Sequence, residues 1–138
     1  MKNWLVVAVV VLLAGCSAPK YSGNALPEAN NVENITIVED VKTRSIFLDS
    51  MLDWCLNNQV KCKVVADGSE HNPEDITLDY VSRWSWDFRT FVADAKISAY
   101  QDQQRVGNVE FKAPNSGNLS KFGDDIERIK AMMDILFD

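Results

Sequence analysis

The most informative pattern in this sequence is Ile76-Thr77-Leu78-Asp79-Tyr80-Val81-Ser82-Arg83-Trp84-Ser85-Trp86-Asp87-Phe88. Apolar or small side chains alternate with largely polar ones over all thirteen residues. A period of two places neighbouring side chains on opposite faces of a β-strand. The stretch therefore predicts a long strand with one apolar face, which the rest of the domain has to cover.

The next run, from Phe91 to Tyr100, alternates in the same way and predicts a second strand. If the two strands turn at Arg89-Thr90, Trp84 lies opposite Ala95 and Trp86 lies opposite Ala93. Large side chains then face small ones, as interdigitated packing beneath a helix requires. We expect an antiparallel hairpin with Trp84 and Trp86 in the core.

Three further strands are expected at residues 34–41, 61–66 and 106–113, where β-branched or alternating side chains predominate. Apolar side chains at helical spacing predict one helix between the first two of these strands and another from Ser120 to the C-terminus. The element order β-α-β-β-β-α predicts an α+β fold. We expect a two-layer α/β sandwich, with a mostly antiparallel sheet and both helices on one face.

The ends of these helices also follow from the sequence. Thr43 or Ser45 can cap the first helix, which should end near residues 57–58. Asp124, Asp125 and Glu127 come early in the second helix, where negative charge suits the positive end of the helix dipole.

Length and composition limit the function. The chain has 138 residues, 46% of them hydrophobic, and a formal net charge of −6. This length and balance fit one globular domain. Nucleic acid is excluded as an expected partner, because affinity for a phosphate backbone comes mainly from Lys and Arg.

The N-terminus predicts export. A basic start, Met1-Lys2-Asn3, precedes an apolar run from Trp4 to Leu13 that is too short to span a bilayer. The following residues, Leu13-Ala14-Gly15-Cys16, resemble the lipobox of bacterial lipoproteins. This resemblance implies that residues 1–15 are a signal peptide and that the Cys16 sulfur carries a diacylglyceryl group.

Lipidation sets the expected location. Two or three fatty chains hold a protein on a membrane stably. In such lipoproteins an Asp after the cysteine favours the inner membrane, and here that residue is Ser17. We expect outer-membrane anchoring with a periplasmic domain at residues 34–138.

Residues 16–33, rich in Pro, Gly and Asn, predict a tether with a reach on the order of 50 Å.

Cys55 and Cys62 remain as a pair in an oxidising compartment, and we expect a disulfide between them. A zinc site would need more ligands, and the single histidine, His71, lies in a polar loop with no recognised catalytic or metal-binding partner. The sequence predicts no metal, cofactor or catalytic residue.

The leader, the Trp84-Ser85-Trp86-Asp87 strand, the Ala-rich strand after it and the last helix together resemble small proteobacterial lipoproteins of the Sbal type. The element order is also similar to that of the lipopolysaccharide-assembly lipoprotein, which plugs an outer-membrane barrel. That family binds lipopolysaccharide through basic residues, whereas this chain is acidic.

Two functions fit these observations. The first is a non-enzymatic envelope lipoprotein that is anchored by lipid and contacts another envelope protein through its polar sheet face or an edge strand. The alternative is a carrier of a small lipid or glycan ligand that uses the aromatic strand Tyr80–Phe91, with Trp84 and Trp86 as candidate contacts.

Overall fold

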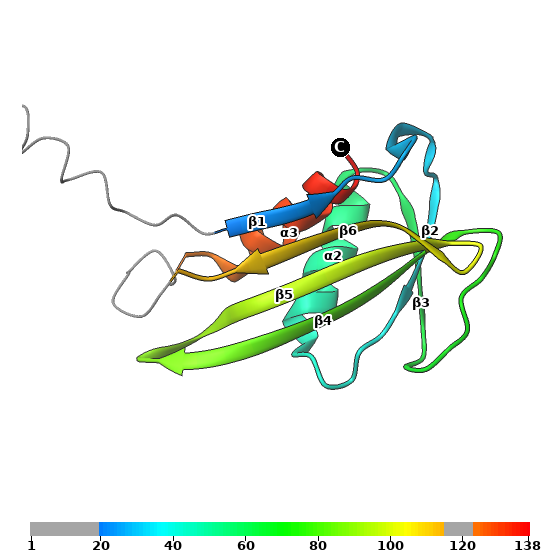
Figure 1. The fold of residues 1–138 in the computed structure, drawn as a ribbon. Helices are drawn as coiled ribbons and strands as arrows, with labels where there is room; N and C mark the ends of the chain where they lie inside the picture. Colours follow the sequence, from blue (N-terminus) through cyan, green and yellow to red (C-terminus); the bar gives the residue numbers. More distant parts are fainter. Residues whose placement is uncertain (1–19, 115–122) are drawn as a thin grey trace, which may run out of the picture.

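The structure, a computed structural model, describes residues 20–114 and 123–138 (Figure 1). The predicted signal peptide at residues 1–15, the predicted lipidation site Cys16 and the predicted helix start at Ser120 lie outside the described residues. The described residues form one mostly antiparallel six-stranded sheet and two α-helices. The fold is therefore mixed α+β, as the sequence predicts.

The sheet has the strand order β1-β6-β5-β4-β2-β3. Three neighbouring pairs, β1/β6, β6/β5 and β5/β4, are antiparallel, whereas β2 runs parallel to both β3 and β4. The strands are β1 Lys20–Asn24, β2 Asn34–Val38, β3 Lys61–Val65, β4 Ile76–Asp87, β5 Arg89–Gln101 and β6 Gln104–Lys112.

The strand β1 corrects the predicted tether. Lys20–Asn24 pairs with β6, with Lys20 opposite Lys112, and a 3₁₀ helix follows at Ala29–Asn31. The folded part thus begins at least fourteen residues before the expected start at Asn34. Sequence patterns miss this strand because its five residues are all exposed and only one, Tyr21, has a large apolar side chain.

The β4–β5 register also differs from the prediction. Trp84 lies opposite Val92, not Ala95, and Trp86 lies opposite Thr90, not Ala93. The turn is tighter than expected, because only Phe88 separates the two strands, and the register shifts between Arg83 and Trp84. The extra residue is Ala93 of β5, so the bulge shifts the alternation of side chains along β5 and leaves that of β4 unchanged.

The first helix, α2, spans Ser45–Asn57, close to the predicted bounds. Neither predicted cap acts as one, because Arg44 is the N-cap residue and makes no side-chain capping bond. Thr43 instead donates its hydroxyl hydrogen to Asp40 Oδ2 over 2.6 Å. The loop before the helix is therefore closed by an Asp-Thr contact, with no cap on the helix itself.

The second helix, α3, spans Asp125–Leu136 and is capped by Asp124, whose Oδ1 accepts from the backbone N–H groups of Ile126 and Glu127. Asp125 and Glu127 lie in its first turn, as predicted. Negative side chains there are favourable because the first N–H groups of a helix carry partial positive charge.

The two helices pack against each other and lie behind the strands in Figure 1. Trp54 Nε1 donates to Asp134 Oδ1 over 2.7 Å, and Lys130 Nζ lies 2.8 Å from Asp53 Oδ2. The core between helices and strands contains fully buried side chains from α2, α3, β2, β4, β5 and β6, among them Phe47, Met51, Ile37, Leu78, Ile97, Phe111, Ile129 and Met133.

Candidate functional site

His71 has a partner that the sequence did not reveal. Its Nε2 lies 3.0 Å from Asp79 Oδ2, and its ring lies against Tyr100, with 4.5 Å between ring centroids. Asp79 alternates with the core residues Leu78 and Tyr80 along β4, so it lies on the opposite face of the sheet. The loop between β3 and β4 therefore crosses that face and is held there by His71.

A cavity of about 310 Å³ adjoins this pair at the end of β2. Its lining is Val38, Glu39, Asp40, Asp67, Gly68, Ser69, His71, Asp79, Tyr80 and Val81. The Tyr80 hydroxyl oxygen accepts a hydrogen bond from the Asp40 backbone N–H at 3.1 Å. Burial raises the pKa of the Tyr80 phenol, the Asp40 N–H lowers it, and the charges of Glu39, Asp40 and Asp67 raise it further.

This cavity does not assemble a recognised catalytic set. Among residues 20–114 and 123–138, no serine or cysteine side chain bonds to the His71 ring. Asp79 Oδ1 and Thr77 Oγ1 are buried without a hydrogen-bond partner. In the same ranges no three His, Cys, Asp or Glu side chains gather closely enough to hold a metal ion. Asp79 orients the His71 imidazole as an acid does in a catalytic triad, but no nucleophile among the described residues bonds to the ring.

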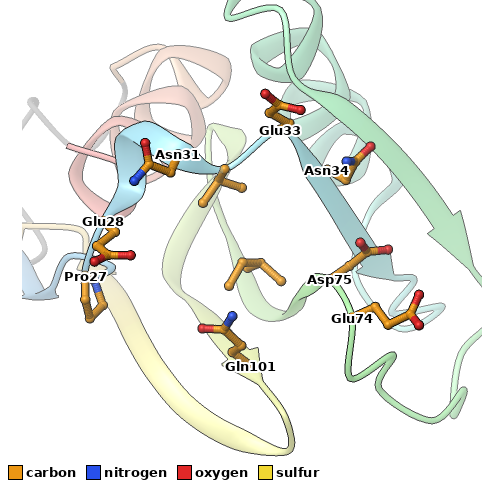
Figure 2. A pocket seen from close by; sticks show the side chains of 10 residues that line it. Pro27, Glu28, Asn31, Glu33, Asn34, Glu74, Asp75 and Gln101 are labelled. Carbon is orange, nitrogen blue, oxygen red and sulfur yellow. The ribbon is translucent and has the colours of Figure 1, made fainter.

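A second cavity, of about 330 Å³, lies at the other end of β2 (Figure 2). Three chain segments line it: the residues before and at the start of β2, the start of β4 and the end of β5. Glu28, Glu33, Glu74 and Asp75 contribute carboxylates, and no Lys or Arg lines it. The remaining lining residues are Pro27, Asn31, Val32, Asn34, Ile76 and Gln101. We call this cavity the acidic cleft.

The acidic cleft is open and polar. In Figure 2, Glu28 lies across the hollow from Glu74 and Asp75. Three of its four carboxylate residues, Glu28, Glu33 and Glu74, are exposed, and no aromatic side chain lines the wall. Apolar and aromatic walls are what most small-molecule pockets use to bury a ligand. The cleft therefore suits a cationic partner that stays partly in water.

The two candidate tryptophans have different surroundings. Trp84 is half-buried against the core, its Nε1 donates to Ser82 Oγ over 2.8 Å, and the Arg44 guanidinium lies 5.2 Å from its ring. Trp86 is 72% exposed, so its predicted core position is wrong. Neither lines the two cavities described above.

Cys55 and Cys62 form the predicted disulfide, which joins the end of α2 to β3. Cys55 is buried and Cys62 is partly buried. Among the described residues, neither helix has the length and apolar character needed to cross a membrane.

Comparison with known proteins leaves the family open. No protein-family model matches the chain, and no curated protein matches it. Among solved structures, the chain is similar to the PelC dodecamer from Paraburkholderia phytofirmans. The alignment covers 83% of this chain and 91% of the PelC chain, with 8% sequence identity and a TM-score of 0.48.

Proposed function

We propose that this chain is an outer-membrane lipoprotein, cleaved before Cys16 and lipidated there, whose periplasmic domain binds another envelope protein without catalysing a reaction. The leader residues Leu13-Ala14-Gly15-Cys16 support the anchoring. The proposal takes the domain to be a two-layer sandwich, with α2 and α3 forming one layer over a single face of the sheet.

The observation that carries the binding role is the charge of the acidic cleft. Four carboxylates from two separate segments line one cavity, with no Lys or Arg among the lining residues. A cleft that is lined by charges of one sign concentrates their electrostatic field and attracts groups of the opposite charge. A partner segment with exposed Lys or Arg side chains fits this surface better than a lipid or a neutral glycan does.

The cleft also changes where the partner is expected to bind. The sequence suggests the polar sheet face or an edge strand, whereas the cleft lies at the sheet end where β2 and β4 begin and β5 ends. Its walls come from loops as well as strands, and complementary charge at such a site governs the association rate and the choice of partner.

The test is crosslinking in intact cells with a photoreactive side chain at Asn31, which lies in the cleft. An identified partner is then purified and titrated against the full-length lipoprotein. Glu33→Lys with Glu74→Lys should weaken binding strongly, and added salt should weaken wild-type binding. Asp49→Lys changes an exposed acid on α2 outside the cleft, and this control variant should bind as wild type does. Equal binding by cleft and control variants would contradict the proposal.

A further inference from the structure

The hairpin between β4 and β5 presents two large aromatic side chains to solvent. Trp86 is 72% exposed and Phe88 is 90% exposed, and their ring centroids are 6.3 Å apart. The hairpin extends past the helices in Figure 1. We call Trp86 and Phe88 the aromatic tip. Two neighbouring exposed aromatics contribute little to the core, so the fold itself does not account for them.

The backbone conformation at Phe88 also suggests that this side chain has a binding role. Its φ angle is +63°, in the left-handed region that favours Gly or Asn. A bulky side chain at this position is disfavoured, and strain of this kind concentrates at sites with a binding role. Phe88 is therefore a costly choice for a turn that a smaller residue would make more easily.

Strand register places the tip relative to the N-terminus. Lys20 lies opposite Lys112, Lys112 opposite Asp94, and Asp94 opposite Arg83, so these four residues lie at one level across the sheet. Phe88 is five residues beyond Arg83, which corresponds to about 17 Å along the strand. The N-terminal end of β1, at Lys20, lies toward the tip, because β1 and β5 both run away from the tip.

Little chain separates this end of the sheet from the proposed anchor. Cys16 lies four residues before Lys20, so the Cα atoms of these two residues are at most about 14 Å apart. Phe88 lies about 17 Å beyond the row that contains Lys20, which is farther than the chain from Lys20 to Cys16 can reach. A bilayer that holds lipids on Cys16 therefore lies within reach of the aromatic tip.

One row of charged residues near this end of the domain carries an excess of bases. The row at the level of Lys20 carries three bases, Lys20, Lys112 and Arg83, against one acid, Asp94. Arg83 Nη2 pairs with Asp94 Oδ2 at 2.6 Å, which leaves two exposed lysines directly opposite each other. Like charges in this position repel, and anionic headgroups would relieve the repulsion.

We propose that the aromatic tip, Trp86 and Phe88, inserts into the headgroup region of the bilayer that carries the lipid anchor. The proposal rests on lipidation of Cys16, which belongs to the proposed function. Aromatic side chains favour the membrane interface. Docking at this end leaves the acidic cleft, at the opposite end of β4 and β5, directed away from the membrane.

The test uses the full-length lipidated protein in vesicles of phosphatidylethanolamine and phosphatidylglycerol with brominated acyl chains, which quench nearby tryptophans. Wild-type fluorescence should be lower in brominated than in ordinary vesicles. Trp86→Phe should remove most of this difference, because Trp54 is buried and Trp84 is half-buried against the protein core.

The matched control adds Leu56→Trp to Trp86→Phe. Leu56 is 76% exposed near the end of α2, beside the start of β3 and away from the tip. This variant restores the number of tryptophans without restoring lipid quenching. If wild-type protein floats with the vesicles but its fluorescence is the same in both lipids, tip insertion is wrong and the anchor stands. If wild-type protein does not float, the anchor and the tip insertion are both wrong.

Discussion

Trp54 and Asp134, eighty residues apart in the chain, are joined by a 2.7 Å hydrogen bond from the indole Nε1 of α2 to the carboxylate Oδ1 of α3. A hydrogen bond to a charged acceptor is stronger than one between neutral groups. The indole of Trp54 is otherwise buried, and its ring also contacts Phe137, with 5.1 Å between centroids. This bond fixes one helix against the other at their outer edge.

Asp134→Ala should lower the free energy of unfolding by roughly 1–2 kcal/mol, because the indole N–H loses a charged acceptor at a partly buried site. A urea melt of the full-length protein measures this. Asp49→Ala removes an exposed acid from α2 and should leave the midpoint nearly unchanged. Equal midpoints for the two variants would show that the bond contributes no stability.

Trp84→Ala and Trp86→Ala should separate the two roles within the aromatic strand. Trp84 packs against the core and bonds to Ser82, so its loss should cost roughly 2–3 kcal/mol, below the range for a fully buried aromatic. Trp86 is mostly exposed, and its loss should change stability by less than about 0.5 kcal/mol. Denaturant midpoints for both variants provide the measurement, and a larger loss at Trp86 would contradict the facing described here.

Opening the Cys55–Cys62 disulfide should cost about 2.5 kcal/mol, from the chain entropy of a closed loop of this length. Cys62→Ser is a better variant than Cys55→Ser, because Cys62 is only partly buried and serine at this position leaves no buried cavity. Wild-type protein in reductant should show the same shift in midpoint. Two free thiols in alkylated native protein from the periplasm would rule the disulfide out.

Tyr80 should make the domain less stable at alkaline pH. The pKa of its phenol is raised above 10.0 in the folded protein, so the unfolded chain loses the phenolic proton first as pH rises. The contribution of the protonated Tyr80 phenol to the free energy of unfolding is complete below pH about 10, and it is lost as the pH rises through the folded-state pKa. Tyr80→Phe should reduce the slope of stability against pH in this range. Unfolding midpoints of both proteins from about pH 9 to about pH 11, roughly one unit either side of the tyrosine value, test it. Parallel slopes would exclude the effect.

Cys16→Ala should abolish fatty-acid labelling and leave an uncleaved precursor. The resemblance to a lipobox implies that both lipid transfer and cleavage depend on the cysteine sulfur. Metabolic labelling with a fatty acid and fractionation of the membranes measure the result. Wild-type protein that takes up no label and fractionates with soluble periplasmic proteins would end the lipoprotein proposal.

The parts of the fold that follow from local pattern could be predicted. The alternation from Ile76 to Phe88 and the helical spacing in residues 45–57 depend only on neighbouring side chains, and both elements form where expected. The strand β1 could not be found in this way, because its pairing with β6 comes from the other end of the chain and its side chains stay exposed.

The candidate sites depend even more on tertiary structure. His71 and Asp79 are eight residues apart, yet no local spacing rule joins a loop histidine to a strand aspartate on the sheet face that the loop crosses. The acidic cleft combines Glu28, Glu74 and Gln101 from three segments that meet only after β2, β4 and β5 have paired. Composition reveals the acids but not their assembly.

Pairing of β1 with β6 has a consequence for the order of folding. The first strand to leave the ribosome or the export channel can find its partner only after residues 104–112 have followed. Contacts between distant parts of a chain form late, since a long loop must close first. Until then the β6 edge is open to other chains, and an exposed edge invites aggregation. We expect β1, the strand nearest the proposed lipid anchor, to dock last, so that anchoring as proposed would be coupled to completion of the sheet.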